Sequence, residues 1–141
     1  MKTTSAYAEW QGNLSKGSGR VKLPSIGFET SYDSLSRFEN GTYTNPEELI
    51  AAAHAACFSM ALSHQLSEKG HIPRKVETEA QVKLDRNDTG FYIKEILLST
   101  RADIDDIDEK TFFEIAEDAK KNCPVSQALA AVSINLNAVL L

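Results

Sequence analysis

The segment 49–62 constrains the fold of this chain more than any other, because it is apolar on nearly every side. Within it, only His54 and Ser59 are plainly polar. A helix on a protein surface keeps one polar face, whereas a helix that is apolar all round is enclosed by other parts of the protein. The sequence therefore predicts a helix that is covered on every side, and its many alanines allow close packing against another helix or a sheet.

The residues around this segment predict where the helix begins and ends. Asn45 can cap it, Pro46 suits the first helical position, and Glu48 can complete a capping box. Gly70 is typical of a C-terminal cap. We therefore expect one helix over residues 46–69, which at about 1.5 Å of rise per residue is roughly 36 Å long.

Predicted strands and helices occur in separate blocks, which is typical of an α+β fold with antiparallel sheet rather than a doubly wound fold. Residues 87–90 are expected to form a hairpin turn, and residues 32–44 an exposed loop. The predicted strands are 6–14, 21–23, 26–30, 74–86, 91–102 and 132–141. The remaining predicted helices are 109–122, with Phe112, Phe113, Ile115, Ala116 and Ala119 buried, and a single turn over 126–131.

Composition and charge narrow the class of protein. A chain of 141 residues, 42% of them hydrophobic, can bury one ordinary core, so we expect a single domain over residues 1–141. The net charge of −5 argues against nucleic acid or an anionic membrane as a partner, because both bind positively charged surfaces. The N-terminal residues 1–10 have no apolar core of the length that a signal peptide needs, and no segment reaches the roughly 18 apolar residues of a membrane span. We therefore expect a cytoplasmic protein with a small or uncharged partner.

The chain has two cysteines, Cys57 in the apolar segment and Cys123 directly before Pro124. Cytoplasmic thiols are normally reduced, so a disulfide between them would be transient and either catalytic or sensory. A cysteine reacts as its thiolate, and the pKa of a free cysteine, about 8.5, is higher when the thiol is buried. A buried Cys57 therefore needs a nearby positive charge or hydrogen-bond donors to become reactive.

Three side chains could supply that stabilisation: His54, Arg20 and Arg37. His54 lies three residues before Cys57, on nearly the same face of the helix. An arginine is favoured on physical grounds, because it stays protonated and its planar fork can bind a sulfur anion together with an incoming oxygen. A carboxylate is then needed to orient the arginine, and Glu47, which has no part in the helix cap, is the candidate.

The spacing of Glu47 and Cys57 places a demand on the structure. Ten positions separate them, which on one continuous helix is about 15 Å of rise. They cannot share a small site within one straight helix. Either the helix is broken near Pro46, or Glu47 reaches the Cys57 of a second subunit in a dimer with two equivalent sites.

Residues 45–62, 36–39 and 122–125 also carry a family resemblance. They closely resemble the family of osmotically inducible protein C and the organic hydroperoxide resistance proteins, and the likeness is closer to the osmotically inducible branch. The resemblance extends over nearly the whole chain. It implies a peroxiredoxin-like cysteine peroxidase that works as an intertwined α+β homodimer, in which antiparallel sheets enclose the long helices and the sites lie at the subunit interface.

The same resemblance implies a role for each site residue. Cys57 is implied to be the peroxidatic thiol, oxidised to a sulfenic acid by an organic hydroperoxide or hydrogen peroxide, and Cys123 the resolving thiol that forms a disulfide with it. Arg37 is implied to activate Cys57, and Glu47 to position Arg37. Arg20 is a rival, because in the organic hydroperoxide resistance branch the arginine comes from the glycine-bearing turn. No cofactor is implied, but an external dithiol, of lipoyl type in at least one branch, must restore the thiols.

Two other interpretations stay open. A non-enzymatic redox-sensing or stress-binding module would also use two thiols, but it would be oxidised once where an enzyme cycles. A zinc site could draw on His54, Cys57, His64 or His71, although these residues lack the closely spaced pairs typical of zinc sites. For His54 itself, helix packing is the expected role.

Overall fold

The computed structural model describes residues 1–141 and divides them into two compact units, Met1–Leu49 and Ile50–Leu141. The expected α+β class is confirmed, with two three-stranded sheets and one long helix. The single domain over residues 1–141 stays a prediction.

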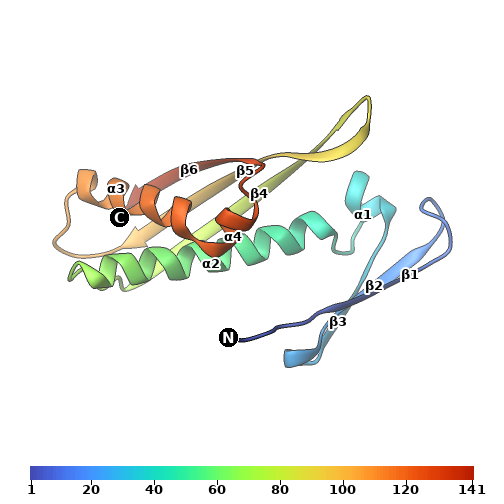
Figure 1. Ribbon diagram of the computed structural model, residues 1–141, viewed down its shortest axis with the longest axis horizontal. Helices are drawn as coiled ribbons and strands as arrows, with labels where there is room; N and C mark the ends of the chain where they lie inside the picture. Colours follow the sequence, from blue (N-terminus) through green and yellow to red (C-terminus); the bar gives the residue numbers. More distant parts are fainter. The chain divides into compact units, whose positions relative to one another are not determined.

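The first unit contains an antiparallel sheet in the order β1-β2-β3 (Figure 1). Its strands are β1 (Tyr7–Gln11), β2 (Ser18–Leu23) and β3 (Phe28–Tyr32), and the 3₁₀ turn Pro24–Ile26 joins the last two. Gly19 of β2 pairs with Trp10 on one side and Tyr32 on the other, and the two rings lie 5.5 Å apart. A Cβ at Gly19 would lie 2.5 Å from the Tyr32 ring. Glycine therefore allows the two aromatic rings to meet over the sheet.

The expected exposed loop over residues 32–44 is wrong in part, because it contains the short helix α1 (Ser34–Phe38). The Asp33 carboxylate caps α1 by accepting from the Ser36 backbone N–H at 2.8 Å. Ser36 is buried, and its hydroxyl accepts from the Tyr43 backbone N–H. Asp33 and Ser36 thus form a local N-cap. An aspartate at this position is a signal for the start of a helix, which the prediction of a loop did not take into account.

The long helix α2 (Pro46–Glu68) begins as expected and ends one residue earlier than expected. The Asn45 side-chain oxygen accepts from the Glu48 backbone N–H at 2.7 Å, which confirms the N-cap. The Glu48 carboxylate binds the Thr44 hydroxyl instead of completing the capping box. Because α2 is continuous from Pro46, no break in the helix can bring Glu47 and Cys57 together.

Only one side of α2 is covered within the chain, so the expected enclosure on every side is wrong for a single chain. His54, Phe58, Leu62 and Leu66 are buried. The opposite positions, Ala52, Ala53, Ala56 and Met60, are exposed, and Met60 is 74% exposed.

By length and composition, α2 is also the one helix apolar enough to cross a membrane, contrary to the expectation that no segment is long enough. Its many alanines and few charged residues give it this apolar composition. Three side chains of α2, Phe58, Leu62 and Leu66, belong to the hydrophobic core of the second unit. Such packing is typical of a core helix.

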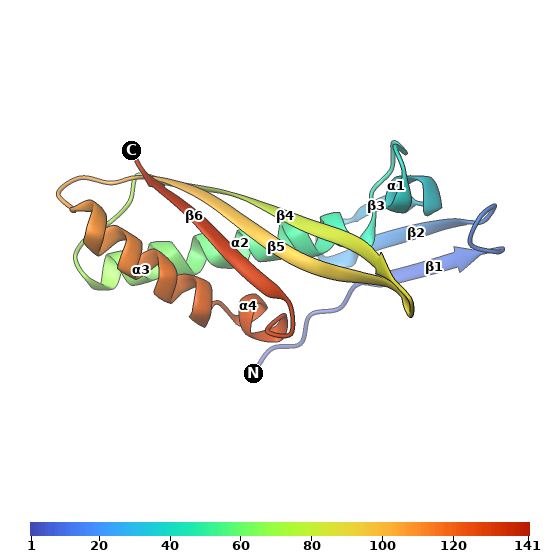
Figure 2. The ribbon, with the colours of Figure 1, turned by 90° about the horizontal axis from the view of Figure 1, so that it is seen from above.

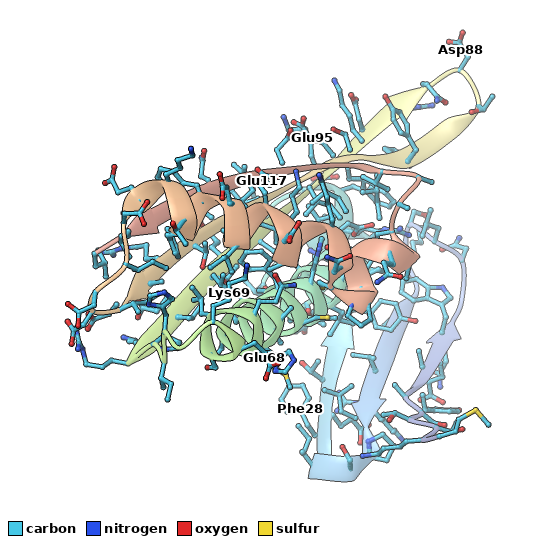
Figure 3. The ribbon with its side chains drawn as sticks, turned by 60° about the vertical axis from the view of Figure 1, so that its left-hand side comes forward. Phe28, Glu68, Lys69, Asp88, Glu95 and Glu117 are labelled. Carbon is cyan, nitrogen blue, oxygen red and sulfur yellow. The ribbon has the colours of Figure 1, made fainter.

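The second unit contains a sheet in the order β4-β5-β6 (Figure 2), formed by β4 (Lys75–Asn87), β5 (Gly90–Asp103) and β6 (Ser133–Leu140). The β4–β5 hairpin is antiparallel as expected, and Asp88 lies at its tip (Figure 3). β6 runs parallel to β5, which departs from the expected antiparallel sheet. The helices α3 (Glu109–Asn122) and α4 (Pro124–Ala128) provide the crossover connection that a parallel pair requires.

The core of this unit lies between the sheet, α2 and α3. Asp108 caps α3, because its carboxylate accepts from the Thr111 backbone N–H at 3.0 Å. Phe112 is fully buried, but Phe113 is 42% exposed, so its expected burial is wrong: adjacent helical residues point about 100° apart. The buried cluster comprises Phe58, Leu62 and Leu66 of α2, Ile96, Leu98 and Ala102 of β5, Ile104, and Phe112, Ile115, Ala116 and Ala119 of α3.

Candidate active site

The two cysteines lie side by side in the second unit. The Cys123 thiol donates to the Cys57 sulfur, and the two sulfurs are 2.8 Å apart. Both are free thiols; Cys123 is fully buried, and Cys57 is partly exposed. A disulfide bond is about 2.05 Å long. The sulfurs therefore need to approach by less than about 1 Å to form one.

The break between α3 and α4 places Cys123 in this position. Cys123 is both the C-cap of α3 and the N-cap of α4, with φ −55° and ψ 126°. This extended ψ is the conformation that a following proline imposes, and Pro124 is the first residue of α4. The Cys-Pro step thus ends α3 and holds the buried thiol at the corner between two helices.

The surroundings of Cys57 within this unit favour its protonated form. Burial raises the pKa of the Cys57 thiol, and the hydrogen bond from Cys123 raises it further. The Val125 backbone N–H acts in the opposite direction, as a hydrogen-bond donor to the sulfur. No positive charge is among these groups. The unit therefore has the geometry for a disulfide but lacks a cation that would ionise the thiol.

His54 has a specific polar partner beside the thiol pair. Its Nε2 lies 2.7 Å from the Ser126 hydroxyl of α4, and both side chains are buried. Burial lowers the pKa of His54, so the ring is neutral near pH 7. Its Nδ1 is buried without a partner. Ser126 was not among the predicted site residues; its only signal in the sequence is its position three residues after Cys123, the same spacing as that of His54 and Cys57.

Arg37 and Glu47 are brought together in the first unit. The Glu47 Oε1 accepts from Arg37 Nε at 3.2 Å and from Nη2 at 2.9 Å. The Glu47 side chain is 9% exposed and that of Arg37 is 38% exposed. The second carboxylate oxygen, Oε2, is buried without a partner. Glu47, which had no role in the helix cap, thus orients a guanidinium that still faces solvent.

The contact depends on how α1 joins α2. The Asn45 side-chain amide donates to the Ser36 backbone oxygen at 2.7 Å, which ties the start of α2 to α1. Arg37 follows Ser36 in α1, and Glu47 is in the first turn of α2. Asn45, the capping residue of α2, therefore also holds Arg37 and Glu47 close to each other.

Arg20, the rival of Arg37, has other partners. Its Nε donates to Glu29 at 2.6 Å and its Nη1 to the Ser31 hydroxyl at 2.9 Å, both on the neighbouring strand β3. The Arg20 side chain is 45% exposed. The hydrogen bond from Arg20 lowers the pKa of the Glu29 carboxyl group. The structure thus pairs Arg20 with a strand carboxylate and Arg37 with Glu47.

A pocket of about 420 Å³ lies beside Arg37 in the first unit. Its walls include the aromatic rings of Trp10 and Tyr32 and the side chain of Leu14, and Pro46 also lines it. Asp33 and Ser34 line it as well, so the pocket combines aromatic and aliphatic walls with a polar edge at Arg37, which suits an apolar molecule that carries a polar end.

The residues considered for a zinc site do not gather in the structure. It contains no group of three or more His, Cys, Asp or Glu side chains that could hold a metal ion. His54 instead pairs with Ser126, and Cys57 with Cys123.

Comparison with known proteins relates this arrangement to one family. Residues 39–137 match the family model described as OsmC-like protein. The chain is 47% identical to peroxiredoxin OsmC of Escherichia coli, over 88% of this chain and 87% of that protein. Among solved structures, it is similar to the organic hydroperoxide resistance protein OhrB of Bacillus subtilis, with a TM-score of 0.72 and 26% identity over 97% of this chain and 98% of the other.

An organic hydroperoxide resistance protein from Elizabethkingia anophelis is also similar, with a TM-score of 0.77 and 25% identity over 100% of both chains. The family model covers more than half of the chain, and the Escherichia coli relative is similar over nearly all of it. The chain belongs to the OsmC-like protein family.

Proposed function

We propose that this protein is a thiol peroxidase that reduces organic hydroperoxides to alcohols. The single observation that carries the proposal is the 2.8 Å separation of the Cys57 and Cys123 sulfurs. Similarity to proteins named peroxiredoxin and organic hydroperoxide resistance protein supports the same activity.

The cycle has three steps. The Cys57 thiolate attacks the terminal peroxide oxygen; the O–O bond breaks, and the alkoxide takes a proton and leaves as the alcohol. Cys57 is then a sulfenic acid. The Cys123 sulfur attacks it, which forms the disulfide and releases water. An external dithiol, of lipoyl type, reduces the disulfide by exchange, so the cycle needs no bound cofactor or metal.

We further propose that the site is completed in a homodimer, by the ion pair of Arg37 and Glu47 from a second copy of the chain. Three observations support this. α2 is continuous, so about 15 Å of helix rise separates Glu47 from the Cys57 of its own chain. The exposed side of α2 carries Ala52, Ala53 and Ala56, small residues that allow close helix packing. The Cys57 pKa is raised within its own unit, so the thiol needs a cation from elsewhere.

In this dimer, the partner subunit's Arg37 stabilises the Cys57 thiolate and then the departing alkoxide. Glu47 keeps the guanidinium oriented through the two hydrogen bonds to its Oε1. The pocket beside Arg37 accepts the organic group of the substrate against Trp10, Leu14 and Tyr32. Each methylene buried there adds about 0.8 kcal/mol of binding, which favours alkyl and aryl hydroperoxides over hydrogen peroxide. We place the protein in the cytoplasm, where the thiols start reduced.

The test is steady-state consumption of tert-butyl hydroperoxide and hydrogen peroxide by the purified protein with dihydrolipoamide. We expect many turnovers per thiol, a higher kcat/KM for the organic peroxide, and a sulfenic acid on Cys57 that dimedone traps. A redox sensor would consume about one equivalent of peroxide and stop. Consumption that continues after Cys57→Ser would contradict the proposal.

A further inference from the structure

We propose that His54 and Ser126 are positioning residues for the resolving step, because their hydrogen bond holds the segment 123–128 against α2 with Cys123 on Cys57. The inference rests on the peroxidase cycle proposed above. It assigns a function to the two buried polar side chains that the chemistry of the cycle does not use.

Two contacts join the same two segments side by side. On α2, His54 and Cys57 are three residues apart and share a helix face. At the start of α4, Cys123 and Ser126 are also three residues apart. His54 contacts Ser126 at 2.7 Å, and Cys57 contacts Cys123 at 2.8 Å. A contact that fixes one pair therefore fixes the position of the other.

The hydrogen bond is shielded from water at both ends. His54 is 0% exposed and Ser126 is 4% exposed. A hydrogen bond in such surroundings is stronger than one in water, and an unpaired group there is costly. Solvent does not compete for the bond, so it can hold a short helix in place.

Packing alone does not account for a histidine at position 54. The buried Nδ1 has no partner, and a phenyl ring of similar size would fill the space without that unpaired nitrogen. What histidine provides, and an apolar ring lacks, is the hydrogen bond between Nε2 and the Ser126 hydroxyl.

The resolving step is where such positioning matters. α4 has five residues, and the Cys-Pro corner separates it from α3. The sulfenic acid of Cys57 has two fates. If Cys123 attacks, an S–S bond forms, the S–O bond breaks and water leaves. If a second hydroperoxide reacts first, it transfers an oxygen to the sulfur, which gives a sulfinic acid and an alcohol. The fraction of time that Cys123 is docked decides between them.

The experiment measures the ratio of Cys57 sulfinic acid to Cys57–Cys123 disulfide by mass spectrometry. Reduced protein is treated with tert-butyl hydroperoxide, without a dithiol. We expect Ser126→Ala to raise this ratio about tenfold, the effect of one lost buried hydrogen bond. Ser126→Thr keeps a hydroxyl and should stay near the wild-type ratio.

Ser59→Ala is the matched control. The Ser59 hydroxyl also joins α2 to another element, through a 2.7 Å hydrogen bond to Thr78 of β4, but it does not contact α4. Its loss should lower stability and leave the ratio unchanged. An equal rise in Ser59→Ala would overturn the proposal, because the effect would then reflect general loosening.

The double variant His54→Phe/Ser126→Ala separates positioning from stability, and it also serves if Ser126→Ala alone does not fold. Replacing both partners with apolar groups leaves stability near that of the wild type, yet the ratio should still rise about tenfold. A wild-type ratio in this folded variant would overturn the inference. If the wild-type protein forms neither disulfide nor sulfinic acid, the proposed peroxidase function itself fails, which is a distinct result.

Discussion

The two compact units contain different parts of the proposed site. The unit Ile50–Leu141 contains both cysteine sulfurs, 2.8 Å apart, but only burial and neutral groups act on the pKa of the Cys57 thiol. The unit Met1–Leu49 contains an oriented guanidinium beside a pocket with aromatic walls, but it has no cysteine. In the proposed site, forming the disulfide and ionising the thiol are therefore separate tasks of different parts of the chain.

The largest expected effect on peroxide turnover comes from replacing the two cysteines. Cys57→Ser should abolish peroxide turnover, because the remaining thiol, Cys123, is fully buried and out of reach of the peroxide. Cys123→Ser should still consume about one equivalent of peroxide without added thiol, since the first step needs only Cys57. Peroxide consumption measured by ferrous oxidation separates the two outcomes. Equal residual turnover in both variants would break the assignment of roles.

The next largest expected effect comes from replacing Arg37, the proposed activating cation in the unit Met1–Leu49. Arg37→Ala should lower kcat/KM at pH 7 by about 10²–10³-fold, the usual cost of removing one charge-stabilising donor. Arg20→Ala, which loses a surface pair with Glu29, is the control and should stay within about threefold.

The pH dependence of Arg37→Ala sharpens this test. Burial raises the Cys57 pKa, and a nearby arginine lowers it, so removing the arginine moves the apparent pKa upward. The loss should therefore be greatest at low pH and shrink as pH rises towards the raised pKa. Stopped-flow rates from pH 5 to 9 measure the shift. A loss that is constant across this range would show that Arg37 does not act on thiolate ionisation.

A third prediction tests whether a second copy of the chain completes the proposed site. Ala56→Arg places a long, charged side chain on the exposed alanine side of α2, where close helix packing is proposed. It should shift the protein towards monomer in sedimentation and lower turnover by up to the same factor as Arg37→Ala. Ala131→Arg, at an exposed alanine outside α2, is the matched control. A dimeric, fully active Ala56→Arg would contradict this packing.

The smallest expected effect concerns Glu47. Glu47→Gln keeps the shape but removes the charge that strengthens both hydrogen bonds to Arg37, so we expect about a tenfold loss in kcat/KM. In the Arg37→Ala background the same change should have little further effect, because Glu47 acts through Arg37. A double-mutant cycle measures this coupling. Additive losses would give Glu47 an independent role.

Much of the fold could be predicted because its signals are local. The cap at Asn45, the proline at the first helical position and the alternation along residues 74–86 each depend on neighbours in the sequence. The parallel pairing of β6 with β5 could not be read in this way, because an alternating strand has the same pattern in either direction. The exposure of Phe113 was missed for a related reason: apolarity does not say which side of α3 faces the core.

The sequence by itself determined the long apolar helix, the two thiols and the need for a cation near Cys57, because these follow from residue type and spacing. Only the tertiary structure decided which residues meet. It paired Arg20 with Glu29, which left Arg37 with the Glu47 carboxylate that the resemblance had implied, and it placed Ser126 against His54. Contacts between residues far apart in the sequence depend on how helices and strands pack, and no local pattern records that packing.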